Sequence, residues 1–202
     1  MSEENQHAQP PAASESEMEE NFRTLLSPFG SEPHRRARQR AINFLLAHAD
    51  ESHPRLLAAL RANPTALDAP SIIEVLPLFG REESVPLLEE IMSRGDEYAS
   101  RSAGVALGQH PSPSALESLL RGLESHSNET LIAAADGLAA RGDGSACEAL
   151  RKLVRHHDAA VRYHVVRAAG KLGCLGPDEL AALAETDPDA DVRALAESLE
   201  RP

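Results

Sequence analysis

Aromatic side chains are scarce in this sequence: they make up 3% of the residues, and tryptophan is absent. Surfaces that stack nucleic-acid bases or cradle a chromophore depend on such rings, so both kinds of site are disfavoured. Lysine is nearly absent too, because arginine supplies all but two of the 20 basic residues, a bias typical of a GC-rich bacterial genome. With a net charge of -12 the chain lacks the positive excess that neutralises phosphates, and we expect no nucleic-acid partner.

Cysteine is limited to Cys147 and Cys174, which show no Cys-x-x-Cys spacing and have no histidine at metal-ligand spacing. This usage predicts two separate, small, buried residues in a reducing compartment and argues against a zinc site. No apolar run approaches the roughly 18 residues of a membrane span. Residues 1–11 lack a basic flank followed by an apolar stretch. We therefore expect no membrane helix, no secretory signal and a cytoplasmic location.

Motifs that carry chemistry are missing as well. The sequence has no Gly-x-Ser-x-Gly nucleophile elbow and no phosphate-binding loop. Its nine histidines include no pair at i, i+4 beside a carboxylate on one predicted helix, so exposed or helix-capping histidines explain them better than metal ligands do. We expect no catalytic residue, no metal and no cofactor.

What the chain does contain is a period of 31 residues. Reading every thirty-first position from Leu26 gives a column of mostly leucine residues, which we call the leading column. The columns one residue before and three residues after it are also largely apolar, so the three columns form one helical stripe. A second stripe of the same period begins at Ala41, Ile42 and Leu45. Six helical hairpins therefore fit from about residue 17 onward, and they must stack because a hairpin this small cannot bury its stripe alone. The leading column is Leu26, Leu57, Leu88, Leu119, Leu150 and Ala181.

Residues between the hairpins support the same architecture. Gly80, Gly142 and Gly173 lie in phase where a glycine can adopt the left-handed conformation that ends a helix. Glu197 and Glu200 replace apolar residues in the last helix, which has no following hairpin to cover it. The predicted fold is all-α: a right-handed α-solenoid of about six 31-residue helical hairpins.

The N-terminal region is acidic. We predict that residues 1–17 form a disordered tail and that residues 18–202 form the solenoid. Met18 to Leu26 makes an amphipathic stripe, which Ser27-Pro28 interrupts before Phe29. We expect this segment to dock as a capping helix; the alternative is a free segment that binds in a groove.

The C-terminal hairpins carry a familiar pattern. A short turn with Asp158, then Val161-Arg162, then a small-residue run that closes in Leu172-Gly173 resembles the HEAT-like repeats of the phycobilisome-lyase type. The segment Asp189 to Leu199 repeats the pattern, and Arg101 to Gly108 is a looser version of it. The aspartate of such a turn can cap the second helix, and the arginine can reach a carboxylate or carbonyl of a neighbouring hairpin. The resemblance implies a protein-binding module; some members help attach bilins or act as immunity partners of toxins.

The predicted binding face follows from helical geometry. Second helices usually line the concave side of a curved solenoid, and five columns lie opposite their core stripe. A plain solvated face is the alternative, but Ile132, Tyr163 and Leu195 add apolar area to it. Tyr163 and Arg167, one turn apart, are the pair that we expect to anchor an interface. The predicted partner-binding residues are Arg36, Gln39, Arg40, Asn43, Glu74, Arg101, Asp136, Tyr163, Arg167 and Lys171.

The leading functional hypothesis is a non-catalytic scaffold or adaptor that binds a partner protein on this concave face and is a monomer outside its complex. One alternative is an immunity or inhibitor protein whose acidic C-terminal hairpin covers a basic toxin or enzyme. Another is an accessory subunit of a bilin lyase, against which the low aromatic content counts. The basic cluster His34 to Arg40 either binds an anionic partner or compensates the acidic tail, and we expect the second.

Overall fold

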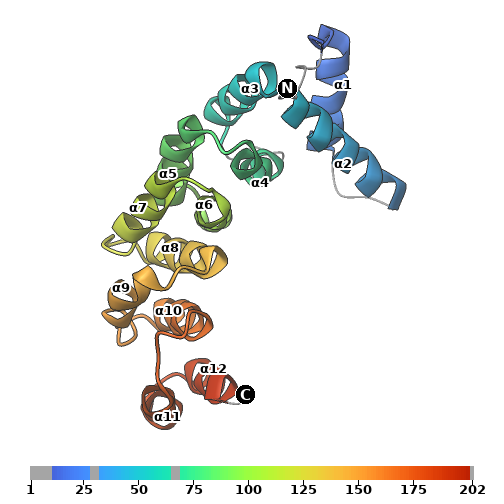
Figure 1. The fold of residues 1–202 in the computed structure, drawn as a ribbon. Coiled ribbons are helices and arrows are strands. Elements are labelled where there is room, and N and C mark those ends of the chain that lie inside the picture. Colours follow the sequence, from blue (N-terminus) through green and yellow to red (C-terminus); the bar gives the residue numbers. More distant parts are fainter. Residues whose placement is uncertain (1–10, 28–31, 65–68, 201–202) are drawn as a thin grey trace, which may run out of the picture.

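In the part of the chain that the structure describes, the helices pair into six successive hairpins, which stack into a curved α-solenoid (Figure 1). The computed structural model describes residues 11–27, 32–64 and 69–200, and within these ranges it contains α-helices and short 3-10 turns but no strand. The all-α solenoid predicted from the 31-residue period is therefore confirmed. The hairpins are α1 (Glu15–Leu26) with α2 (Glu32–Ala47), α3 (Ala49–Ala62) with α4 (Ala69–Phe79), α5 (Val85–Arg94) with α6 (Glu97–Gln109), α7 (Pro113–Gly122) with α8 (Asn128–Arg141), α9 (Cys147–Arg151) with α10 (Ala159–Lys171), and α11 (Pro177–Thr186) with α12 (Ala190–Glu200); the 3-10 turns η1 (Glu82–Ser84) and η2 (Gly144–Ala146) precede α5 and α9.

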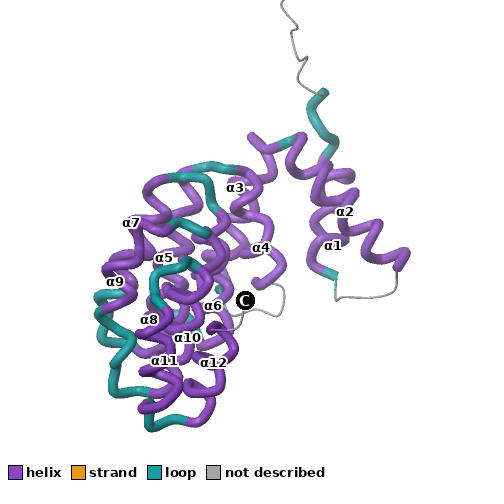
Figure 2. Tube along the Cα trace, turned by 60° about the horizontal axis from the view of Figure 1, so that its bottom comes forward, coloured by secondary structure: helices purple, strands orange, loops and turns teal. Residues whose placement is uncertain are grey.

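The two helices of each hairpin belong to two different rows. From α3 onward the first helices form the outer row, and the second helices, α4, α6, α8, α10 and α12, line the concave side (Figure 1). The α1–α2 hairpin lies at one end of the stack in both views (Figure 2). The second helices thus take the concave position that the sequence predicts.

The ends of the helices follow the local signals in the sequence. Gly80, Gly142 and Gly173 have φ values of 61°, 76° and 69°, which is the left-handed conformation predicted for them. Asp96 and Asp158 cap the N-termini of α6 and α10. The Asp96 carboxylate accepts a hydrogen bond from the Ala99 N–H at 2.8 Å, and the Asp158 carboxylate accepts one from the Val161 N–H at 3.1 Å. These helix ends are therefore set by local backbone conformation and capping.

The apolar stripes meet in one continuous core. Leu57, Leu88, Leu119 and Leu150 of the first stripe are all buried, and the core cluster runs from Met18 in α1 to Ala196 in α12. Each fully buried leucine contributes about 2 kcal/mol relative to an exposed one. Glu197 and Glu200 are exposed on α12, as expected for the terminal helix.

Polar contacts between hairpins join residues that lie about one repeat apart. Arg81 pairs with Asp50, His53 Nε2 lies 2.8 Å from Ser84 Oγ, and Arg141 Nη1 donates to the His110 carbonyl at 2.8 Å, each over a separation of 31 residues. Since these bonds connect adjacent hairpins only, the molecule is held together by nearest-neighbour interactions.

The contact between α6 and α8 is closer than the others and was not foreseen. A Cβ atom at Gly104 would lie 2.2 Å from the Ala133 carbonyl oxygen, and one at Gly108 would lie 2.1 Å from the Gly137 carbonyl oxygen. Real Cβ atoms do not approach backbone oxygens this closely, so only glycine fits. Backbone packs directly on backbone at this point, which we call the glycine seam.

The amphipathic segment at the N-terminus is a docked capping helix. Met18 and Leu25 of α1 are 1% and 0% exposed, and Arg55 of α3 pairs with Glu15 at 2.6 Å. The interpretation as a free segment is therefore wrong. Ser14 forms a capping box with Glu17, so the helix begins inside the predicted tail; residues 1–10 of that tail, and Pro28 and Phe29, lie outside the described residues.

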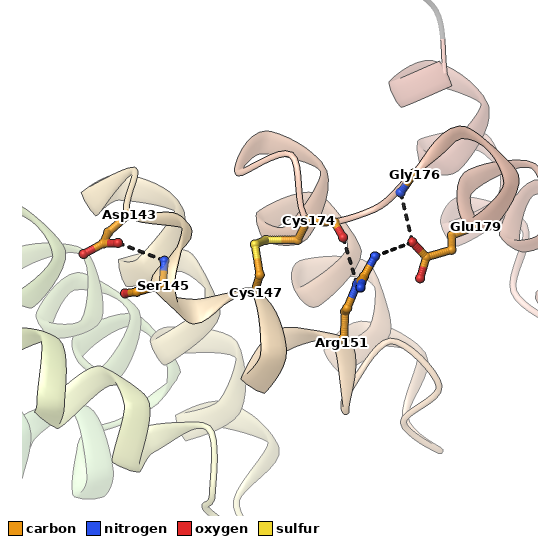
Figure 3. Close-up of a disulfide and its surroundings, with 7 residues drawn as sticks. All are labelled: Asp143, Ser145, Cys147, Arg151, Cys174, Gly176 and Glu179. Carbon is orange, nitrogen blue, oxygen red and sulfur yellow. Dashed lines mark hydrogen bonds and ion pairs between the residues drawn. A yellow bond between two sulfur atoms is a disulfide. The ribbon is translucent and has the colours of Figure 1, made fainter.

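The cysteines require a correction, because Cys147 and Cys174 form a disulfide (Figure 3). Cys147 begins α9 and Cys174 follows α10, and the two ends of an antiparallel hairpin lie side by side. The prediction of two separate thiols overlooked this geometry, and the argument from cysteine usage for a reducing compartment falls with it. Arg151 braces the same place by donating from Nε to the Cys174 carbonyl at 2.9 Å and from Nη2 to Glu179 at 2.6 Å.

None of the helices in the described ranges combines the length and the apolar character needed to cross a bilayer.

Candidate functional site

A hollow on the concave side lies between α4 and α6 and reaches one residue of α8. Its volume is about 920 Å³. We call it the α4–α6 groove. Its lining consists of Pro70, Ser71, Ile73, Glu74, Asp96, Glu97, Tyr98, Arg101, Ser102, Val105, Ala106, Gln109 and Asp136.

The groove combines an apolar floor with an exposed aromatic ring. Ile73 and Ala106 are buried beneath it, and Val105 is half-buried. Tyr98, in the first turn of α6, is 67% exposed. Together with Leu78 it is the most exposed large apolar side chain among the described residues. An exposed ring beside a hollow is a typical anchor point for a binding partner.

Charges in the groove are mostly negative. Glu74, Asp96, Glu97 and Asp136 supply four carboxylates, whereas Arg101 is the single basic residue among the lining residues that the structure describes. Glu74 accepts a hydrogen bond from Arg38 of α2 at 2.8 Å, yet its side chain stays 57% exposed. With Glu74 paired, the exposed negative charge of the groove comes mainly from Asp96 and Glu97 at the start of α6.

Asp136 forms the centre of a polar cluster that links three helices of the concave row. It lies on α8 and is 7% exposed. Its Oδ1 accepts hydrogen bonds from His164 Nδ1 at 2.7 Å and from Arg167, both on α10, and its Oδ2 accepts one from Arg101 Nε of α6 at 3.3 Å. An ionised carboxylate can only accept, so Nδ1 is the protonated nitrogen of His164.

The Asp136 cluster keeps its carboxylate charged. Burial alone would raise the pKa of the Asp136 carboxyl, but the hydrogen bond from His164 and the charges of His164 and Arg167 outweigh burial and lower the pKa below its usual value. The cluster thus fixes α6, α8 and α10 relative to one another. Asp136 is not the free groove residue that its column predicts, because the interior of the helix row encloses it.

The arginine of the repeat pattern reaches a carboxylate of the next hairpin. Arg162 donates from Nε and Nη2 to the two carboxylate oxygens of Asp187, both at 2.9 Å, and these side chains are 8% and 4% exposed. Its Nη1 donates to the His156 carbonyl at 2.9 Å. The arginine therefore has the structural role that the resemblance implies. Residues 120–200 match the family model for HEAT repeats.

This match supports the HEAT-like repeats that the sequence predicts. It covers the end of α7, helix α8 and the last two hairpins. The earlier hairpins share the same 31-residue period and the same order of helices. The sequence has no significant match among curated proteins.

The predicted partner-binding residues lie on α2 and along the concave row from α4 to α10 rather than in one place. Those of α2 are exposed, and Gln39 donates to Asn43 at 3.0 Å. Arg101 and Arg167 keep side chains 42% and 41% exposed while they bind Asp136. The α4–α6 groove includes Glu74, Arg101 and Asp136; Lys171 is exposed at the end of α10; and Arg36, Gln39, Arg40 and Asn43 lie on α2.

The side chains of the predicted anchor pair, Tyr163 and Arg167, lie in two different environments. Tyr163 lines a second hollow of about 650 Å³ between α10 and α12, and its ring meets the His164 ring edge-on at 5.6 Å between centroids. Arg167 turns instead toward Asp136. Ile132, Tyr163 and Leu195 are half-buried against the core, so they expose less apolar area than the sequence suggests.

Sequence reasoning missed Tyr98, although a signal for it was present. Tyr98 stands two repeats after Arg36 in a column that lies opposite the core stripe. The repeat pattern is shifted by one residue in the neighbouring segment Arg101 to Gly108, and this irregularity obscures the column to which Tyr98 belongs. Asp96 and Glu97 were missed because a helix-capping turn explains them equally well.

Proposed function

We propose that this protein is a non-catalytic scaffold that binds a partner protein along its concave face. The observation that carries the proposal is the α4–α6 groove, an open hollow of about 920 Å³ with Tyr98 exposed at its edge. HEAT repeats generally mediate protein–protein interaction, and stacked repeats create extended concave surfaces suited to it.

The chemistry of the groove supports a binding role over a catalytic one. Asp136 is the buried carboxylate of the groove, and three donors hold it in its ionised form. A general base needs a pKa near the working pH, and these donors move the pKa of Asp136 in the opposite direction. The groove is therefore a preformed surface with a fixed charged interior.

The rigidity of the concave row supports the same function. The Asp136 cluster and the glycine seam hold α6, α8 and α10 in fixed positions. A surface that is already ordered loses less conformational entropy when a partner binds, so more of the contact energy remains as affinity.

Site-specific photo-crosslinking in the producing cells tests this proposal. A photoreactive phenylalanine analogue would replace Tyr98 or Tyr163 on the concave row, and in a matched control it would replace Glu117, an exposed residue of the outer helix α7. We expect one and the same protein to be attached at the concave positions and not at the outer position. Attachment at Glu117 alone, or none at the concave positions, would contradict the proposal.

Once the attached protein is identified, its affinity for the intact chain can be measured directly. We expect Tyr98→Ala to weaken binding by about tenfold, since truncation of an interface tyrosine often costs more than 1 kcal/mol. Tyr163→Ala and Arg167→Ala test the anchor predicted from the sequence in the same assay. Unchanged affinity in all three variants would remove the concave face as the binding surface.

A further inference from the structure

The α4–α6 groove carries information about the chemistry of its occupant. Its carboxylates differ in how they are engaged. Asp136 is enclosed by its three donors, and Asp96 Oδ1 accepts the N–H of Ala99 as a helix cap. Within the described part of the chain, no hydrogen bond or ion pair engages the exposed carboxylate of Glu97. Glu97 therefore presents negative charge that the described side chains leave uncompensated, while Glu74 stays 57% exposed beside Arg38.

The ring of Tyr98 is a second and independent feature. A solvated acidic face needs neither a hollow nor an aromatic side chain that is 67% exposed, yet the groove has both. A guanidinium group binds best where an aromatic face and a carboxylate are both within reach, because the ring attracts the cation and the carboxylate accepts its hydrogen bonds. Tyr98 directly follows Glu97 at the start of α6.

The apolar floor fits the rest of such a side chain. Arginine carries a three-carbon stem that packs on apolar surface while its charged head stays in the polar rim. Pro70 and Val105, which are half-buried, provide apolar surface in the same hollow. An extended segment laid along the row would place alternate side chains on the floor and in the solvent.

Charge excludes the other occupants. Nucleic acid would be repelled by the exposed carboxylates of Glu74, Asp96 and Glu97. The chain's own N-terminal region has six acidic residues and no basic one in residues 1–20, and a second copy carries the same net charge of -12. We propose that the α4–α6 groove binds an extended, arginine-rich segment of the partner protein. This inference rests on the proposed scaffold function and specifies its partner.

Fluorescence anisotropy with short labelled peptides tests the inference on the full chain. The probes are three peptides of equal length in which alanine alternates with arginine, lysine or glutamate. We expect the arginine peptide to bind saturably, the lysine peptide to bind more weakly because it stacks less well on Tyr98, and the glutamate peptide not to bind. Added salt should weaken the arginine peptide, since the groove is open to solvent.

Matched variants locate the binding. The double variant Glu74→Gln/Glu97→Gln removes two charges from the groove, and Glu117→Gln/Glu124→Gln removes two exposed charges on and beside the outer helix α7. We expect the groove variant, and separately Tyr98→Ala, to weaken the arginine peptide by about tenfold and the outer variant by less than about twofold. Thermal unfolding followed by circular dichroism checks that all variants are folded.

The outcomes separate this inference from the function on which it rests. Equal weakening by both double variants, or equal binding of the arginine and glutamate peptides, would overturn the inference. If the arginine peptide fails while Tyr98 still crosslinks to the partner, the partner uses other chemistry in the groove and only the inference falls. Absence of adducts at both Tyr98 and Tyr163 overturns the scaffold function itself.

Discussion

At the scale of single residues, Asp136 shows what a column in the sequence can and cannot reveal. Asp136 and Arg167 occupy the same column one repeat apart, so their contact follows from the 31-residue period. The contact from Arg101 does not, because it depends on a side chain that reaches across from α6. The sequence therefore places these residues on the concave row but does not show that they neutralise one another.

Replacement of Asp136 tests the cluster. Asp136→Asn leaves His164, Arg101 and Arg167 facing a neutral amide, and we expect unfolding free energy to fall by about 2 kcal/mol, moderated because both arginines are partly exposed. Urea unfolding at neutral pH measures the loss. Asp191→Asn, on an exposed residue of α12, is the control and should cost less than about 0.5 kcal/mol. Equal losses in the two variants would show that the cluster is not stabilising.

His53 gives the fold a dependence on pH. Burial, followed by the charge of Arg81, lowers the pKa of His53 below its usual 6.5. Below about pH 6.5 His53 is therefore protonated in the unfolded chain but stays neutral in the folded chain. The free energy of unfolding falls as the pH drops through this region. We expect His53→Gln to show a smaller loss between pH 7.5 and 5.5 than the unaltered chain, as measured by urea midpoints. The carboxyls with lowered pKa values, such as Glu89 and Asp136, lose their contribution only below their ordinary range, so they do not obscure this window.

At the scale of elements, the sequence predicts the hairpins well because their signals are local. Apolar spacing sets each helix, while Gly142 and Asp158 set its ends through backbone conformation and capping. The glycine seam is different. In the sequence Gly104 is one more small residue of an apolar stripe. The structure shows that α8 lies so close that a methyl group at this position has no room. The distance between two helices of different hairpins cannot be predicted from the sequence of one repeat.

The seam can be tested with one methyl group. Gly104→Ala places a Cβ against the Ala133 carbonyl, and we expect it to destabilise the chain by about 3 kcal/mol although alanine favours helices. Gly144→Ala is the control, because a Cβ at Gly144 meets nothing within 4 Å and should change stability by less than about 0.5 kcal/mol. Thermal melts of both variants decide the matter, and a Gly104→Ala protein as stable as the control would refute direct backbone packing.

The disulfide links the start of α9 to the end of α10. α9 is only five residues long, so the bond supports the shortest helix of the outer row. Cross-linking a loop of this length stabilises a fold by about 3 kcal/mol through the unfolded chain. We expect Cys147→Ser/Cys174→Ser to lower the unfolding free energy by that order and to speed amide hydrogen exchange in α9 and α10 before other helices. Uniform exchange in all hairpins would contradict a local role.

At the scale of the whole molecule, stability is a sum over neighbouring hairpins. The polar contacts span about one repeat, and the core runs without interruption from end to end. The fold was predictable from sequence because the same pair of apolar helical stripes recurs every 31 residues along the chain. The α4–α6 groove was only partly predictable, since its hollow arises between hairpins and the repeat is irregular there.

Truncation tests the additivity. Ending the chain after Gly176 removes α11 and α12, takes Asp187 away from Arg162 and uncovers α10. We expect the remaining hairpins to stay helical by circular dichroism while hydrogen exchange accelerates in α10 and leaves α4 and α6 unchanged. Collapse of helicity throughout the chain would show that the hairpins do not behave as separable units.

The glycine seam also fixes the spacing between two helices of the proposed binding surface. Because α6 and α8 touch through their backbones, no layer of deformable side chains separates them, and the pitch between these two helices is fixed. Under the proposed scaffold function, a partner that crosses the centre of the row must match that pitch. We therefore expect the molecule to act as a stiff template that accepts binding segments by the spacing of their side chains, with adjustment confined to its two ends.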